Sequence, residues 1–170
     1  NKNILCSKYA NESWFKKSDV TFEFTSNQLY VKSISCNNFL GFCNFPDETL
    51  ELHVKKISFD FINLPSNLRT LTLSKITFNK KIEKFPERLE NLSFVSDYNY
   101  SLDNLPLSLK MFQFNGYCSI LQDYSYTNIA LLSIRGKYTS PILGLPKTLI
   151  HLNYYSDIVH KLPALPPNMK

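Results

Sequence analysis

The chain has 170 residues, 44% of them hydrophobic and 14% aromatic, and its formal net charge is +5. This length and apolar content are typical of one folded domain and argue against a disordered chain. The positive charge comes mainly from Lys residues dispersed along the sequence, and the only arginines are Arg69, Arg88 and Arg135. Because nucleic-acid-binding faces cluster their basic residues, we expect no nucleic-acid partner.

The amino-terminal part is less regular than the rest of the chain. Residues 3–15, which include Leu5, Tyr9 and Trp14, are predicted to form a short helix. Residues 20–24 and 29–34 alternate in side-chain character with period two, as strands do. We interpret residues 1–19 as an N-terminal cap and residues 20–44 as divergent repeats.

Residues 45–170 consist of a proline-led repeat. Its pattern, Leu-Pro-x-x-Leu-x-x-Leu-x-Leu, is clearest at residues 64–73. The prolines of the repeat are Pro46, Pro65, Pro86, Pro106, Pro146 and Pro166. They step by 19, 21, 20, 40 and 20 residues, and the double step contains a degenerate copy with Tyr126 at the proline position. We expect the array to continue beyond Lys170.

A period of about 20 residues is typical of a leucine-rich-repeat solenoid, in which successive coils stack around one core. The Leu-x-Leu element predicts a strand, so stacked copies form a parallel sheet, expected on the concave side. About ten residues remain for the convex side, too few for a regular helix, so we expect extended or short-turn structure there. The strand residues predicted to point into the core are Leu52, Val54, Leu71, Leu73, Leu92, Phe94, Phe112, Phe114, Leu132, Ile134, Leu152 and Tyr154.

A second series of apolar residues is predicted to anchor the convex side. Four residues before the prolines stand Ile82, Leu102, Ile142 and Leu162, and eight residues before them stand Phe78, Tyr98, Tyr138 and Ile158. The first coil of such an array exposes apolar side chains, and the cap at residues 1–19 is expected to cover them.

Residues 78–89, Phe-Asn-Lys-Lys-Ile-Glu-Lys-Phe-Pro-Glu-Arg-Leu, resemble the FNIP-type repeat of amoebae and giant viruses. Residues 98–106 are similar to the next copy, with Tyr98 in place of Phe. The resemblance covers about residues 45–170 and weakens at 118–126 and 138–146, where the Phe-Asn pair is missing. Because many FNIP-repeat proteins carry an F-box before the repeats, the resemblance implies substrate recognition for a ubiquitin ligase. Residues 4–6 and 14–15 are similar to the tail of an F-box.

A second resemblance gives an alternative. Residues 162–169, Leu-Pro-Ala-Leu-Pro-Pro-Asn-Met, are similar to the Leu-Pro-x-Leu-Pro repeat of bacterial secreted effectors. Some of these effectors carry a ubiquitin-ligase domain after the repeats, which implies a repeat domain whose catalytic domain is absent here.

Motifs for catalysis are missing from the sequence. The histidines, His53, His151 and His160, do not stand at metal-ligand spacing. The glycines form no phosphate-binding loop, and no nucleophile elbow is present. We therefore predict no enzymatic activity, no catalytic residue, no metal site and no cofactor.

The four cysteines, Cys6, Cys36, Cys43 and Cys118, show no CxxC pair. We predict reduced, packed thiols, because free Cys is among the most buried residue types. A disulfide between Cys36 and Cys43 stays open as an alternative.

Residues that point outward from the later strands are the candidate partner-binding site on the predicted concave face. They are Met111, Gln113, Leu131, Ser133, Arg135, His151, Asn153 and Tyr155. Their mixture of apolar, aromatic and guanidinium groups resembles the centres of protein interfaces. The alternative that they are ordinary solvated sheet residues stays open.

We predict a non-catalytic module that binds a protein partner, and no small-molecule substrate. No apolar run is long enough to span a bilayer and no signal peptide is recognisable, so we expect a cytoplasmic location. A secreted or cell-surface location stays open, as does a structural or adhesion solenoid that stacks against copies of itself.

Overall fold

The computed structural model describes residues 18–25, 28–37, 43–55, 62–78, 81–158 and 160–169. Side chains are described for Ser35 and for residues 45–55, 64–78, 81–158 and 160–169. Within these ranges the chain forms strands and turns and contains no helix. The helix predicted at residues 3–15 lies outside the described residues, as does most of the predicted cap.

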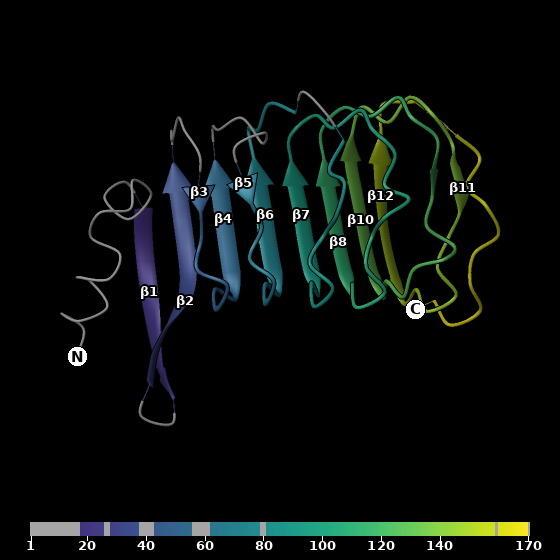
Figure 1. Ribbon diagram of the computed structural model, residues 1–170. Coiled ribbons are helices and arrows are strands. Elements are labelled where there is room, and N and C mark those ends of the chain that lie inside the picture. The colour runs from purple at the N-terminus through teal and green to yellow at the C-terminus, as the bar shows by residue number, and fades with distance from the viewer. Residues whose placement is uncertain are drawn as a thin grey trace.

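Strands recur throughout the described chain. They are β1 (Ser18–Thr25), β2 (Gln28–Asn37), β3 (Cys43–Asn44), β4 (Glu51–Lys55), β5 (Ile62–Asn63), β6 (Thr70–Ser74), β7 (Asn91–Val95), β8 (Met111–Asn115), β9 (Gln122–Asp123), β10 (Leu131–Gly136), β11 (Ile142–Gly144) and β12 (His151–Ser156). Eight of them form one sheet, here called the main sheet, in the order β1-β2-β4-β6-β7-β8-β10-β12 (Figure 1). From β2 to β12 every neighbouring pair is parallel, so the chain is a parallel β-solenoid.

The strands are stacked in the register that the repeat predicts. Leu71 pairs with Leu92, Leu92 with Phe112, Phe112 with Leu132 and Leu132 with Leu152. Partners in successive strands are about 20 residues apart in the chain, so the sequence period equals one coil of the solenoid.

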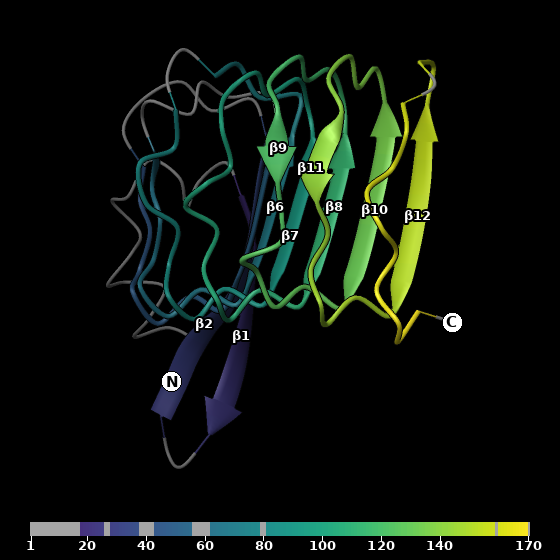
Figure 2. The same cartoon turned by 90° about the vertical axis from the view of Figure 1, so that its right-hand side faces the viewer.

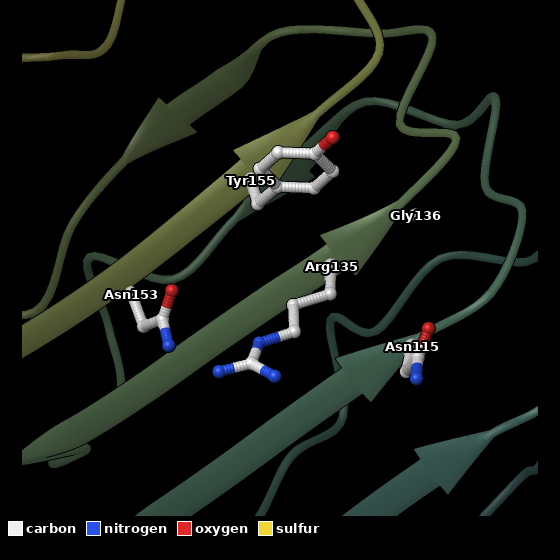
Figure 3. Close-up of a pocket in the computed structure, with 5 residues that line it drawn as sticks. All are labelled: Asn115, Arg135, Gly136, Asn153 and Tyr155. Carbon is white, nitrogen blue, oxygen red and sulfur yellow. The ribbon is translucent and has the colours of Figure 1, made fainter.

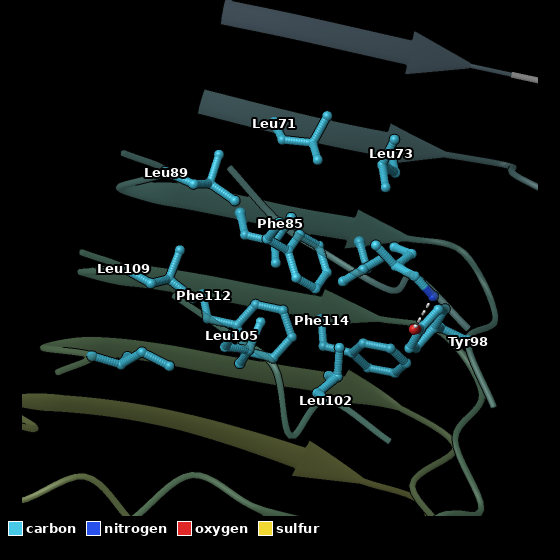
Figure 4. Packing of buried hydrophobic residues seen from close by; sticks show 14 of the residues in the cluster. Leu71, Leu73, Phe85, Leu89, Tyr98, Leu102, Leu105, Leu109, Phe112 and Phe114 are labelled. Carbon is cyan, nitrogen blue, oxygen red and sulfur yellow. Dashed lines mark hydrogen bonds between the residues drawn. The ribbon is translucent and has the colours of Figure 1, made fainter. Parts of the chain in front are cut away.

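The core lies between the main sheet and the returning segments (Figure 4). Leu71, Leu92, Phe112 and Leu132 are at most 1% exposed, as predicted. Their strands alternate buried and more exposed residues, because successive side chains of a strand point to opposite faces. Two faces of the main sheet are thereby defined, an inner face in the core and an outer face toward solvent.

The tight turns that lead into β4, β6, β7, β8 and β12 each begin at a proline. The carbonyl of Pro86 accepts a hydrogen bond from the Leu89 amide at 3.1 Å, and Pro106 and Leu109 are joined in the same way at 3.0 Å. Proline suits this position because its ring fixes the backbone angle φ, which limits the conformations of the chain where it enters the turn. The leucine that closes the turn is fully buried in both cases, so the Pro-x-x-Leu motif both reverses the chain and anchors it.

The two strands predicted in residues 20–44 are present, but their arrangement differs from that of the repeats. β1 runs antiparallel to β2 and forms a hairpin with it, with a register shift between Thr21 and Phe22. β2 is parallel to β4. The segment therefore contributes one strand to the parallel series and one strand that reverses direction, because two adjacent strands joined by a short connection pair antiparallel.

The returning side of the coils is extended, as predicted. β9 pairs with β11 in a short parallel ladder separate from the main sheet (Figure 2). β3 pairs with β5 in another (Figure 1). The predicted anchors Ile82, Leu102 and Ile142 are at most 4% exposed. The hydroxyl of Tyr98, a residue that is fully buried, accepts a hydrogen bond from the Ile82 amide at 3.1 Å (Figure 4).

The degenerate coil is held by polar groups instead of proline and leucine. Gln122 occupies the anchor position and is 2% exposed. Its Oε1 accepts a hydrogen bond from the Leu102 amide at 3.0 Å, and its Nε2 donates to the Tyr100 carbonyl at 3.0 Å. Tyr126, at the proline position, donates its hydroxyl to the Leu102 carbonyl. Side-chain hydrogen bonds thus satisfy backbone groups where the repeat pattern is lost.

The last described coil buries its apolar residues less than the earlier coils. Ile158, predicted as a core anchor, is 41% exposed, whereas Tyr138 at the same position one coil earlier is 1% exposed. Leu165 is 58% exposed, whereas Leu145 is 7% exposed. The prediction for Ile158 is therefore wrong, because a coil residue is buried only where a further coil covers it and none of the described residues does so here.

Candidate functional site

The outer face of β8, β10 and β12 displays the candidate residues in a regular grid. Met111 pairs with Leu131 and Leu131 with His151, while Gln113, Ser133 and Asn153 form the next row. Neighbouring strands lie about 4.8 Å apart and alternate residues of a strand about 6.7 Å apart.

The third row of the grid consists of Asn115, Arg135 and Tyr155. With this row the structure brings together all eight residues predicted from the sequence, on one surface roughly 10 Å by 13 Å. We call this surface, including Asn115, the outer patch. Asn115 is not among the residues predicted for the site, although Asn115 continues the outward alternation of Met111 and Gln113.

The apolar members of the outer patch are well exposed. Met111 is 41% exposed, Leu131 43% and Tyr155 67%, and the side chains of Arg135 and His151 are exposed as well. Large apolar side chains grouped on one surface can be covered by another molecule at a gain of roughly 25 cal/mol per Å² of buried apolar area.

The polar members of the outer patch make no side-chain hydrogen bond or ion pair with any described residue. Some polar groups elsewhere on this side of the sheet are paired. Asn91 donates to the Thr70 hydroxyl at 3.2 Å, and Glu90 lies 3.7 Å from Arg69 and 3.1 Å from Lys110. The polar groups of the outer patch are therefore available to an external partner, and they lie next to its exposed apolar residues.

A shallow depression of about 520 Å³ lies within the outer patch. Its lining residues are Asn115, Arg135, Gly136, Asn153 and Tyr155 (Figure 3). Arg135 is the only charged residue among them. The depression is open to solvent, which suits a surface contact with a partner better than enclosure of a small molecule.

Glycines at the ends of two strands let the coils approach closely beside this depression. Gly136 has a φ of 111°, which L-residues rarely adopt, and a Cβ there would lie 2.6 Å from the Gly116 carbonyl oxygen. A Cβ at Gly116 would lie 2.2 Å from the Ser96 carbonyl oxygen. Neighbouring coils can therefore approach this closely after Asn115 and Arg135 only because both next positions lack a side chain.

Other chemistry in the described chain is sparse. Among the described residues, no group of three or more His, Cys, Asp or Glu side chains could hold a metal ion. Cys118 is a free thiol and is buried, as predicted. The side chains of Cys36 and Cys43 and all of Cys6 lie outside the described residues. No helix in the described ranges is long and apolar enough to cross a membrane.

Comparison of the chain with protein-family models, with curated proteins and with solved structures gives no match in any of the three. The FNIP and effector resemblances stay predictions from the repeat pattern, as does the concavity of the outer face.

Proposed function

We propose that this chain is a non-catalytic module that binds a protein partner through the outer patch. The observation that carries the proposal is the contrast along one sheet. Met111, Leu131 and Tyr155 are 41%, 43% and 67% exposed on the outer patch, whereas on the outer face of β4, β6 and β7 the only exposed large hydrophobic residue is Val95, at 37%. Exposed Tyr, Met and Arg side chains grouped in this way are characteristic of interface centres.

The proposal is tested by affinity purification of the wild-type chain and of a Leu131→Ala/Tyr155→Ala variant, with identification of the captured proteins by mass spectrometry. The matched control is Leu143→Ala/Tyr117→Ala, since these residues are 58% and 38% exposed and lie outside the outer patch. We expect a partner that the control retains and the patch variant loses.

A direct affinity measurement on that partner should then show a loss of about 2 kcal/mol or more for the patch variant, as for interface hot spots. Equal affinity of wild type and patch variant would remove the basis of the proposal.

From the FNIP resemblance we further propose that the partner is a substrate recognised for a ubiquitin ligase in the cytoplasm. Support for this role comes from residues 78–89 and 98–106 of the sequence alone. Cullin-type ligase subunits in the same purification are the expected result, and their absence from a purification that does capture a partner would contradict the ligase role.

A second candidate function, a structural solenoid that stacks against copies of itself, is favoured by the last described coil. β12 is the last strand of the main sheet among the described residues, and Ile158 and Leu165, which follow it in the chain, are exposed. Sedimentation of the wild type as a dimer or larger species, reversed by Leu165→Lys but not by Leu143→Lys, is the result expected from self-stacking. Leu143→Lys is a matched control because the two leucines are both 58% exposed. A monomeric wild type excludes this candidate.

A further inference from the structure

Arg135 differs from the other two arginines of the chain. Arg69 lies 3.7 Å from a carboxylate oxygen of Glu90, and Arg88 donates to Asn67 Oδ1 at 2.9 Å. Arg135 has no hydrogen-bond or ion-pair partner among the described residues. Its guanidinium is therefore the only one of the three without an acceptor among the described residues.

The surroundings of Arg135 supply further donors and no negative charge. Figure 3 shows its guanidinium lying between the side chains of Asn115 and Asn153, with the Tyr155 ring on the neighbouring strand and its hydroxyl pointing away from the guanidinium. Each asparagine amide brings an NH₂ group that can donate. No Asp or Glu belongs to the outer patch or to the lining of the depression. A ligand group that accepts hydrogen bonds and carries negative charge complements this set.

The shape of the donor set favours a carboxylate. A guanidinium presents its N–H groups as a planar fork that matches a carboxylate in a bidentate pair, and such charge-assisted bonds are stronger than neutral ones. The exposed Tyr155 ring, on the strand next to Arg135, can cover the methylene groups of an acidic side chain. Phosphate on nucleic acid is disfavoured, because a nucleic-acid site clusters several basic residues and the outer patch has one.

We propose that the depression lined by Asn115, Arg135, Asn153 and Tyr155 is a carboxylate-binding site that receives a Glu or Asp side chain of the protein partner. This inference deepens the proposed function and rests on it for the source of the carboxylate. The site itself can be measured without the partner, because a small acidic probe presents the same group.

The experiment titrates the ¹⁵N-labelled chain with N-acetyl-glutamate N-methylamide. The matched probe is N-acetyl-glutamine N-methylamide, which has nearly the same shape and no charge. Saturable shifts are expected at the side-chain resonances of Asn115, Asn153 and Arg135 with the glutamate probe and not with the glutamine probe. Raising the salt concentration should weaken the response, since a solvent-exposed charge pair is screened.

Variants test whether Arg135 is responsible. Arg135→Gln should weaken binding of the glutamate probe at least about tenfold, and Arg135→Lys should weaken it less, because the charge remains and the fork is lost. Arg69→Gln is the matched control and should bind like the wild type, because Arg69 is already paired with Glu90. Arg135 is exposed, so these variants are expected to keep the fold, which far-ultraviolet circular dichroism checks.

Several results would overturn the inference. They are the absence of a saturable shift, an equal response to the glutamine probe, unchanged binding by Arg135→Gln, and tighter binding of inorganic phosphate than of the glutamate probe. A partner that depends on Leu131 and Tyr155 but not on Arg135 would leave the proposed function intact and refute the carboxylate site. Probe binding without any partner on the patch would refute the proposed function alone.

Discussion

The hydroxyl oxygens of Tyr124 and Tyr138 lie 2.9 Å apart in the core, and the two residues are at most 1% exposed. Tyr124 belongs to the degenerate coil and Tyr138 to the coil that follows it. Burial raises the pKa of both phenols above the ordinary value. The pair stays neutral, and one hydroxyl donates to the other where water cannot reach.

We expect Tyr138→Phe to reduce the free energy of unfolding by about 1–3 kcal/mol, because the Tyr124 hydroxyl loses this partner in the core. The double variant Tyr124→Phe/Tyr138→Phe should cost less than the sum of the two single variants, since it buries no unpaired hydroxyl. Urea unfolding of all four proteins gives the coupling energy. Strictly additive costs would show that the two hydroxyls do not interact.

Stability should fall at alkaline pH. Burial raises the pKa of Tyr98 to about 12, from a usual value of about 10 in an unfolded chain. Between these values the unfolded state releases the phenol proton and the folded state keeps it, so the free energy of unfolding decreases as pH rises. Below about pH 10 the contribution is fully present. Urea unfolding from pH 8 to 12 checks this, and Tyr98→Phe should show a shallower decline than the wild type.

Restoring the repeat pattern at Gln122 should destabilise the protein. In Gln122→Leu the Leu102 amide and the Tyr100 carbonyl both lose their glutamine partner. We expect a cost of about 1–3 kcal/mol from these unsatisfied backbone groups, partly offset by the apolar side chain. Thermal unfolding gives the sign of the change. A more stable variant would mean that packing outweighs the hydrogen bonds in this coil.

The same truncation should cost more inside the array than in the last described coil. Leu132 is 1% exposed, whereas Leu152, its partner on β12, is only partly buried. Leu132→Ala should destabilise by about 2–5 kcal/mol, and Leu152→Ala by clearly less, because the cost follows the cavity left in a closed core. Equal costs, measured by urea unfolding, would indicate that both positions are covered to the same extent in solution.

A methyl group at Gly136 should not be tolerated. Gly136→Ala combines a backbone φ of 111° with a Cβ 2.6 Å from the Gly116 carbonyl oxygen. We expect a loss of roughly 2 kcal/mol or more in the free energy of unfolding. Lys137→Ala, at the exposed next residue, is the control and should be nearly neutral. A Gly136→Ala variant as stable as this control would argue against the close approach of the two coils.

The solenoid can be predicted well from the sequence because each repeat is defined by residues that are close together in the chain. The spacing of the prolines gives the coil length, and the alternation of Leu71 and Leu73 gives the face that is buried. Register follows from the same period, so Leu71, Leu92 and Phe112 pair in successive strands as predicted.

Features that depend on a neighbour in space are not predictable in this way. The antiparallel direction of β1 follows from its pairing with β2. Gln122 breaks the apolar pattern, and its role is visible only where its amide meets the Leu102 and Tyr100 backbone.

The sequence by itself determined a stack of coils about 20 residues long and the set of side chains on each face of the main sheet, because both follow from periodicity. Only the tertiary structure decided which side chains find partners. Arg69 meets Glu90 one coil away, while Arg135 meets no carboxylate among the described residues. The physical reason is that hydrogen bonding and burial depend on distances between coils, which a period along the chain does not specify.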